Sequence, residues 1–289
     1  MKHNPVMINE VIEFLNPQKG KVYIDATLGD GGYTKAILEK NPEIEVIAIE
    51  QNSESLERAK VNLKDFQDKI IFVHDNFKNI KDVANGLGYL EISGVVYDLG
   101  LASWQIEKSN IGITFSKNEP LDMRLDDSKK NLTTASEILN KFSAKKIADI
   151  LYKYGDVRKS WAVARRIEIS RTRQPIIYTN DLIEILGTKN PKILAPVFQA
   201  LRIYVNQELE NLTKSLDGAM ELVEDGGKII VVSFHSGEDR IVKNIFRERK
   251  GNKKDIKILT KKPVLPSFEE IALNSRARSA KLRALEKVK

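Results

Sequence analysis

The segment Val22-Tyr-Ile-Asp-Ala-Thr-Leu-Gly-Asp-Gly-Gly32 is the strongest indication of the fold class of this chain. It begins with a mostly apolar run, Val22–Leu28, and ends in a glycine-rich turn, after which residues 34–40 carry a helical pattern. A buried strand, a glycine turn and a helix in this order are typical of the first unit of a parallel sheet with right-handed crossovers. The stretch therefore predicts an α/β fold with a ligand site at the turn.

The alternation of strands and helices continues downstream and is then interrupted. Strand candidates lie at 46–49, 70–73 and 95–97, and helix candidates lie at 53–63 and 80–86. From Thr133 to about Leu186 the patterns are helical only, and an apolar strand pattern returns at 228–234. We therefore predict a doubly wound sheet interrupted by an all-helical domain. The expected divisions are residues 1–110, a substrate-recognition insert at 111–205, and residues 206–289, which complete the sheet domain.

The helical part has recognisable boundaries. Thr134-x-x-Glu137 is a capping-box pattern that predicts the start of a helix, and Gly155 predicts the end of another. Pro196 suits the first position of a long helix through Leu209. Residues 101–131 carry turn residues and few periodic runs, which predicts a long functional loop.

The composition excludes several kinds of chemistry. The 289 residues contain no cysteine and three histidines, which excludes disulfides and cysteine nucleophiles and argues against a metal cluster. No apolar run approaches the roughly 18–20 residues of a membrane helix, and the N-terminus lacks the apolar stretch of a signal peptide. We therefore expect a cytoplasmic protein with no membrane contact and no metal.

The charge of the chain is divided unevenly. The formal net charge is +7, but residues 240–289 hold 16 Lys and Arg against 5 Asp and Glu, a net +11, and the remainder is −4. A basic segment on a mildly acidic body favours a polyanionic partner, most simply nucleic acid. A solvated, partly disordered tail is the alternative that charge alone leaves open.

Three acidic residues, Asp25, Glu50 and Asp98, lie at the ends of predicted strands. The glycine turn, with Gly29, Gly31 and Gly32, lacks the third glycine of a dinucleotide fingerprint, because that position is Thr34. The turn fits the shorter one of S-adenosylmethionine methyltransferases better. Asp25, Glu50 and Asp98 would surround a cationic ligand, and Glu50 is placed to accept hydrogen bonds from ribose hydroxyls. The alternative interpretation is that Asp25 and Asp98 are ordinary strand-end caps and that Glu50 is a surface residue.

Further motifs follow one another along the chain. They are His3-Asn-Pro-Val6, Asp25–Gly32, Asp75-Asn-Phe77, Asp98-Leu-Gly100, Pro120-Leu-Asp-Met-Arg124, Phe198-Gln-Ala-Leu-Arg-Ile203, Val205-Asn206, Ser233-Phe-His-Ser236, Glu238-Asp-Arg240 and Arg276-Ala-Arg-Ser-Ala-Lys281. With these motifs the chain resembles the RsmH (MraW) family of ribosomal RNA small-subunit methyltransferases almost from end to end. The motifs containing Pro120, Phe198 and Ser233 are highly specific in this order.

The resemblance implies a Rossmann-like sheet and methylation of N4 of a decoding-centre cytidine in small-subunit rRNA, with S-adenosylmethionine as cofactor. It also implies that the backbone of Gly31, Gly32 and Tyr33 holds the methionine part, that Phe77 packs near the adenine, and that Gln105 completes the pocket beside Asp98. Departures from the family pattern are Tyr33 for a usual His, Glu50 for a usual Asp, Leu101-Ala102-Ser103-Trp104 for Val-Ser-Ser-Pro, Gly155-Asp-Val-Arg158 for Gly-Glu-Glu-Arg, and Gly237 for Leu.

Three residues are candidates for the chemistry at the cytosine amine. This amine is a poor nucleophile that needs hydrogen-bond acceptors around it. We hypothesise that Asp98, with Ser103 or a nearby backbone carbonyl, accepts from the amine; an Asp98 that only orients the cofactor is the alternative. His235 follows a late strand and is a candidate for a substrate-side role, against a purely structural one.

Basic residues are candidates for rRNA contacts. Asp122 and Arg124 lie in the long loop, where Arg124 suits either a phosphate or an ion pair that anchors the loop. Arg165 and Arg166 belong to a basic stretch of the insert that is either a phosphate-binding face or a solvated one. Because Arg276–Lys281 matches the family, we expect the C-terminal segment to fold back and meet rRNA. The predicted substrate contacts are Asp122, Arg124, Arg165, Arg166, Arg202, Arg276 and Arg278.

The expected partner is small-subunit rRNA within an assembled or nearly assembled subunit, and a homodimer is among the assemblies that the sequence allows. An NAD-linked oxidoreductase on the same sheet is an alternative, but the missing third glycine and the three carboxylates argue against it. An RNA-binding assembly factor without chemistry is another, hinted at by Tyr33 and Ala102 and opposed by the intact glycine turn and acidic residues.

Overall fold

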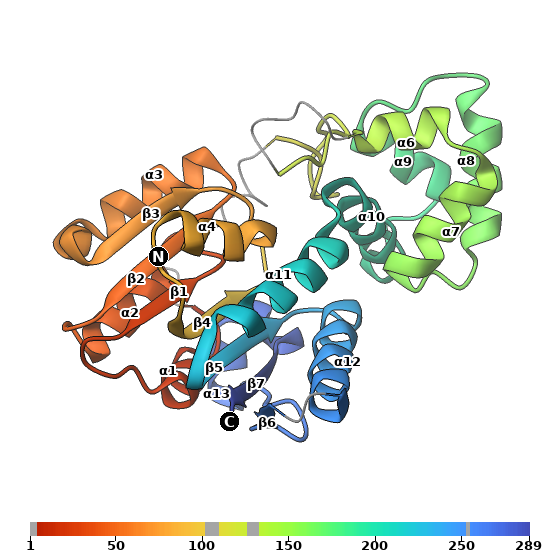
Figure 1. Ribbon diagram of the computed structural model, residues 1–289. Helices are drawn as coiled ribbons and strands as arrows, with labels where there is room; N and C mark the ends of the chain where they lie inside the picture. Colours follow the sequence, from red (N-terminus) through yellow and green to blue (C-terminus); the bar gives the residue numbers. More distant parts are fainter. Residues whose placement is uncertain (1–4, 102–109, 126–132, 253–254) are drawn as a thin grey trace. The chain divides into compact units, whose positions relative to one another are not determined.

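The computed structural model describes residues 5–101, 110–125, 133–252 and 255–289. The chain divides into two compact units, one made of residues 1–100 and 209–289 and the other of residues 101–208. We call them the sheet unit and the helical unit and describe each by itself (Figure 1). None of the described helices combines the length and the apolar character needed to span a bilayer.

The sheet unit is built on seven strands in the order β3-β2-β1-β4-β5-β7-β6. The first five are parallel and β7 is antiparallel to both of its neighbours. The predicted parallel α/β arrangement is thus confirmed. The strands are β1 (Val22–Asp25), β2 (Glu45–Glu50), β3 (Ile70–His74), β4 (Ile92–Asp98), β5 (Val223–Ser233), β6 (Ile256–Ile258) and β7 (Lys281–Lys287).

Helices cover both faces of this sheet. Side chains alternate between the faces along each strand, so that Tyr23 joins one core and Ile24 the other. The first core packs against α1 (Ile8–Leu15), α2 (Gly32–Lys40) and α3 (Ser53–Asn62), and the second against α4 (Ile80–Gly86), α11 (Glu208–Leu222) and α12 (Ser236–Asn252). Near-continuous apolar strands such as Val46–Ile49 are explained by this burial on two sides.

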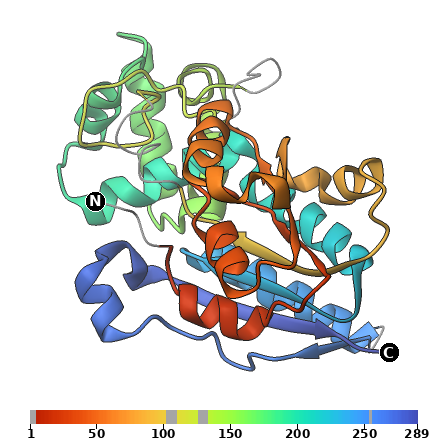
Figure 2. The same cartoon turned by 90° about the vertical axis from the view of Figure 1, so that its left-hand side faces the viewer.

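The C-terminal segment is part of the sheet and is not a loose tail. Strand β7 lies between β5 and β6, and Figure 2 shows it running beside β5 within the sheet. Leu282 and Ala284 are buried in the core, and the buried Arg283 donates from Nε to Oδ1 of Asp239 over 2.6 Å. The prediction that this segment folds back on the α/β domain is confirmed.

The helical unit holds five described helices around a core of its own. Thr134 and Glu137 form the predicted capping box, in which each side chain accepts the other's backbone N–H at 3.1 Å. The helices are α6 (Ala135–Lys141), α7 (Ala144–Gly155), α8 (Ser160–Arg171), α9 (Thr179–Leu186) and α10 (Pro191–Asn206).

The predicted helix from Pro196 to Leu209 is wrong at both ends. Helix α10 begins at Pro191, because Asn190 caps it by accepting the N–H of Lys192 at 3.0 Å. Pro196 lies inside the helix, where it has no N–H to donate to the carbonyl four residues earlier. The helix ends at Asn206, because Gln207 adopts a left-handed conformation with φ of 52°.

Candidate functional site

The glycine turn between β1 and α2 is shaped by the packing of the chain. Gly31 has φ of +87°, and a Cβ atom there would lie 2.6 Å from Cδ1 of Leu63. A Cβ on Gly32 would lie 2.2 Å from Cγ of Pro5. A Cβ atom at either position would fit only if Leu63 or Pro5 moved. At Gly29, with φ of +54°, the nearest heavy atom to a Cβ would be 3.9 Å away, so this position is open.

Asp25 is a buried residue at the base of the turn, and its carboxylate accepts two hydrogen bonds. Its Oδ2 accepts the Thr34 hydroxyl at 2.7 Å, and its Oδ1 accepts the Thr27 N–H at 3.2 Å. Burial raises the pKa of Asp25 to about 6, and these hydrogen bonds oppose the rise. The carboxylate thus links the end of β1 to helix α2. A direct contact of Asp25 with the cofactor stays a prediction.

Glu50 ends β2 and receives backbone donors from both sides. Its Oε2 accepts the N–H of Gly29, and its Oε1 accepts the N–H of Asn52, each at 2.9 Å. Burial raises the pKa of Glu50 to about 7. Each carboxylate oxygen has a second lone pair, so these bonds leave acceptor capacity for ribose hydroxyls. The interpretation of Glu50 as an ordinary surface residue does not fit this geometry.

Asp98 ends β4 and carries a buried acceptor without a partner. Its Oδ1 has no hydrogen-bond partner among the described residues, whereas its backbone N–H donates to Oγ1 of Thr27 over 2.6 Å. Burial and, second, the negative charge of Asp25 raise the pKa of Asp98 to about 7. A buried carboxylate oxygen with no donor is costly. The site is therefore suited to a ligand that brings a hydrogen-bond donor or a positive charge.

Phe77 and Tyr33 are also predicted to contact the cofactor, and neither is a carboxylate at a strand end. Phe77, half-buried in a short 3₁₀ turn, meets Tyr97 edge-on with ring centroids 6.2 Å apart. The buried Tyr33 donates its hydroxyl proton to the carbonyl of Val6, so its side chain holds the N-terminal segment. Only the backbone of Tyr33 remains as a candidate contact. Ser103 and Gln105 lie outside the described residues.

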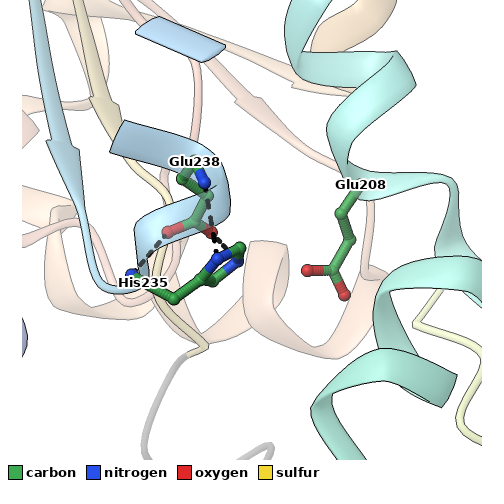
Figure 3. Close-up of side chains that lie close together, drawn as sticks. All are labelled: Glu208, His235 and Glu238. Carbon is green, nitrogen blue, oxygen red and sulfur yellow. Dashed lines mark hydrogen bonds and ion pairs between the residues drawn. The ribbon is translucent and has the colours of Figure 1, made fainter. Parts of the chain in front are cut away.

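His235 forms the N-terminal cap of α12 together with Glu238 (Figure 3). Its Nδ1 accepts the N–H of Gly237 at 3.1 Å, and the buried Glu238 accepts the N–H groups of Phe234 and His235 at 2.8 and 3.2 Å. The imidazole Nε2 lies 3.2 Å from Oε1 of Glu238. Because Nδ1 accepts, the proton of the neutral ring is on Nε2. This is a structural role, and the substrate-side role stays a prediction.

Several arginines proposed to bind rRNA have partners within the helical unit. Arg124 forms a two-pronged pair with Asp122, with distances of 2.6 and 2.8 Å, and Arg202 forms one with Glu208 at 2.8 and 2.9 Å. Arg165 pairs with Glu168, and Arg166 donates to the carbonyl of Leu186. These pairs position the side chains within the unit. Arg276 and Arg278, in the sheet unit, are both exposed.

Sequence reasoning missed two residues of the site, Thr27 and Glu238. Thr27 holds the backbone of Asp98, and Glu238 completes the cap with His235. The spacing His-x-x-Glu just after a strand is a capping-box pattern that could have revealed the second. Nothing in the sequence around Thr27 indicates that its partner lies 71 residues away.

Comparisons with known proteins agree on one family. The sequence profile of the MraW methylase family matches residues 1–288. A protein of Ehrlichia canis named ribosomal RNA small subunit methyltransferase H is 43% identical, covering 99% of this chain and 100% of that protein. A relative of the same name from Carboxydothermus hydrogenoformans is 41% identical, covering 99% and 98%.

A solved structure shares the fold. A Streptococcus mutans protein determined in complex with SAH has a TM-score of 0.50 over the whole of both chains at 13% identity, which confirms the predicted Rossmann-like class. The predictions of a methyltransferase and of S-adenosylmethionine as its cofactor are confirmed together with the family. On the profile match and on identities above 40% over nearly its full length, the chain belongs to the MraW methylase family.

Proposed function

We propose that this methylase transfers a methyl group from S-adenosylmethionine to N4 of a specific cytidine in the decoding centre of small-subunit rRNA. The curated relatives carry a name that specifies small-subunit ribosomal RNA. The choice of N4 and of the decoding centre rests on the family resemblance of the sequence. The structural observation that carries the proposal is the buried Oδ1 of Asp98 at the end of β4, which has no hydrogen-bond partner within the described part of the chain.

The residues at the strand ends fit the cofactor. Asp25 is buried, Glu50 and Asp98 are partly buried, and all three carboxyl groups have raised pKa values, so a cationic ligand would offset the cost of their charges. Glu50 would hold the ribose, and the backbone from Gly31 to Tyr33 would hold the methionine part. When bound, S-adenosylmethionine supplies an electrophilic methyl group on a positively charged sulfur.

Asp98 would act on the amine. The lone pair of a cytosine amine is delocalised into the ring, so an acceptor that binds an N–H favours the tetrahedral nitrogen needed for attack. Oδ1 of Asp98 offers this acceptor in a buried setting. A carboxyl group with a pKa of about 7 is also well matched to take the proton that N4 loses near neutral pH. Ser103, which lies outside the described residues, and His235 remain further candidates.

Substrate recognition is assigned to the helical unit and to the basic C-terminal part of the sheet unit. We propose that residues 111–205 form the substrate-recognition domain and that Arg124, Arg165, Arg166, Arg202, Arg276 and Arg278 contribute to rRNA binding. The target base must leave its stack to reach Asp98, which single-stranded or assembled rRNA allows at lower cost than a duplex. The partner is accordingly an assembled or nearly assembled small subunit.

The test uses labelled S-adenosylmethionine and small subunits from a strain that lacks the enzyme. The wild-type protein should place label on N4 of one cytidine, identified by mapping the modified nucleoside. Asp98→Asn should bind cofactor within a few-fold of wild type and lose most turnover. Label on another atom contradicts the N4 assignment, and absence of label would favour an assembly factor without chemistry. Unchanged turnover in Asp98→Asn would remove Asp98 from the chemistry.

A further inference from the structure

Large apolar side chains are exposed on a short helix of the C-terminal segment. Helix α13 spans Phe268–Leu273 in the sheet unit (Figure 1). Phe268 and Leu273 are 89% and 91% exposed, and Leu265, just before the helix, is 60% exposed. Among the described residues of the sheet unit, Phe268 is the one aromatic side chain in the exposed class. Exposed apolar residues gathered on one element mark an interaction surface.

The protein holds this helix in place, so the exposure is not the fraying of a loose end. Glu270 accepts the backbone N–H of Met7 at 2.6 Å, and Ser267 caps the helix by accepting the N–H of Glu270 at 3.1 Å. Asn274 then donates to the carbonyl of Glu270 at 2.7 Å. Glu270 and Ile271 are partly buried on the inner side, which leaves Phe268 and Leu273 on the outer side.

Two exposed arginines follow this apolar helix in the sequence. A 3₁₀ turn at Ser275–Ser279 follows after one residue, with its Ala277 buried in the core and both Arg276 and Arg278 exposed. Asn274 joins the two elements by accepting the N–H of Arg276 at 3.2 Å. Helix α13 is only about 9 Å long. The exposed ring and the two exposed arginines therefore belong to one short, structured stretch of the surface.

We propose that this area, the α13 surface (Leu265, Phe268, Leu273, Arg276 and Arg278), binds a single-stranded RNA segment. Phe268 stacks on a base, and the guanidinium groups contact phosphates of the same strand. An exposed aromatic ring next to cations is the combination by which proteins hold single strands without reading their sequence. Two exposed arginines close in sequence to an exposed aromatic ring favour a polyanionic strand over a purely apolar partner. The inference rests on the proposed function for the identity of the RNA as substrate.

The first experiment measures affinity for a fluorescein-labelled single-stranded RNA of twelve nucleotides, a probe that does not depend on methylation. Phe268→Ala should weaken binding roughly 5- to 150-fold, since one base stack contributes that much. Phe268→Trp should retain affinity, whereas Phe268→Leu, which keeps the apolar area without a flat ring, should not. Leu90→Ala is the matched control, because Leu90 is a 76% exposed apolar residue of the same unit, and it should bind like wild type.

A second measurement tests the phosphate contacts. The slope of log affinity against log salt should become shallower by about 1.4 in Arg276→Ala/Arg278→Ala, since each phosphate contact contributes about 0.7 for single strands. Cofactor affinity, measured by calorimetry on the same variants, should be unchanged and shows that the fold is intact.

Three results would overturn the inference. One is equal RNA affinity of Phe268→Ala and Leu90→Ala, and another is absence of oligonucleotide binding by the wild-type protein. The third is lost affinity of Phe268→Ala for small subunits with unchanged affinity for the oligonucleotide, which would assign the surface to a protein partner. Absence of N4 methylation by a wild-type protein that still binds the oligonucleotide through Phe268 would overturn the proposed function alone.

Discussion

The backbone N–H of Asp98 donates to the hydroxyl of Thr27 over 2.6 Å and so joins the ends of β4 and β1. Thr27 also donates its own N–H to Asp25, which in turn accepts the hydroxyl of Thr34 in α2. This chain of hydrogen bonds holds the glycine turn against the strand end that carries the proposed acceptor. The position of Asp98 therefore depends on a threonine with no assigned chemistry.

Thr27→Val should test this dependence, because valine keeps the shape of threonine and removes the acceptor. The Asp98 N–H would lose its partner, at a cost of about 1–3 kcal/mol in the free energy of unfolding. The methylation rate should fall roughly tenfold or more. Thr27→Ser should recover most of the rate in single-turnover assays. A Thr27→Val enzyme as fast as wild type would show that the hydrogen bond does not position Asp98.

The stability of the cofactor-free protein should fall as the pH rises from about 5 to 8. The folded-state pKa values of Asp25, Glu50 and Asp98, about 6 to 7, exceed those of ordinary carboxyl groups. The folded state then binds more protons in this range, so each group's stabilisation is complete below its unfolded pKa and is lost as the pH passes its folded pKa. Urea unfolding measures this trend. Asp98→Asn should show a shallower fall, and an equal fall would contradict the raised pKa of Asp98.

Cofactor affinity should show the opposite trend. A cationic ligand favours ionised carboxyl groups, so affinity for S-adenosylmethionine should rise between pH 5.5 and 8. Calorimetric titration at several pH values measures this change, and proton release on binding should be detected in buffers of different ionisation enthalpy. An affinity independent of pH would show that the three carboxyl groups keep the same ionisation with and without the cofactor.

Gly31→Ala should destabilise the fold through a steric clash as well as through its backbone angle. Gly20→Ala is the matched control, since Gly20 has a φ of +71° with nothing within 4 Å of a Cβ. The control should cost about 1–2 kcal/mol, the usual penalty of a left-handed alanine. Gly31→Ala should cost about 1–3 kcal/mol more, because its Cβ meets Leu63. Equal losses in urea unfolding would mean that Leu63 moves aside freely.

Variants of His235 can separate the helix cap from chemistry. His235→Ala should lose about 1 kcal/mol of stability, because Nδ1 no longer accepts at the start of α12. His235→Asn provides a good cap and should restore that stability. If the histidine also acts on the substrate, both variants should be slow. Wild-type turnover of His235→Asn would assign this residue to the cap alone.

The parallel sheet, the capping box at Thr134 and the strand-end carboxylates were predictable from the amino-acid sequence. These features depend on residues adjacent in the chain, since strand, turn and helix signals are local. The same reasoning failed at Pro196. Both Pro191 and Pro196 suit the first turn of a helix, and the helix begins at Pro191 because Asn190 caps it there. A local pattern cannot rank such alternatives.

The surroundings of those carboxylates and of the cations became known from the folded structure. The backbone of Asp98 is joined to Thr27, Gly31 packs against Leu63, and Arg202 is paired with Glu208, because folding brings these residues together. The uneven charge of the sequence was compatible with a partly disordered C-terminal tail or with an RNA-binding surface. The position of β7 within the sheet excludes the disordered tail. Burial and ion pairing depend on which residues are close in space. The sequence therefore identifies the charged residues but does not show what surrounds each of them.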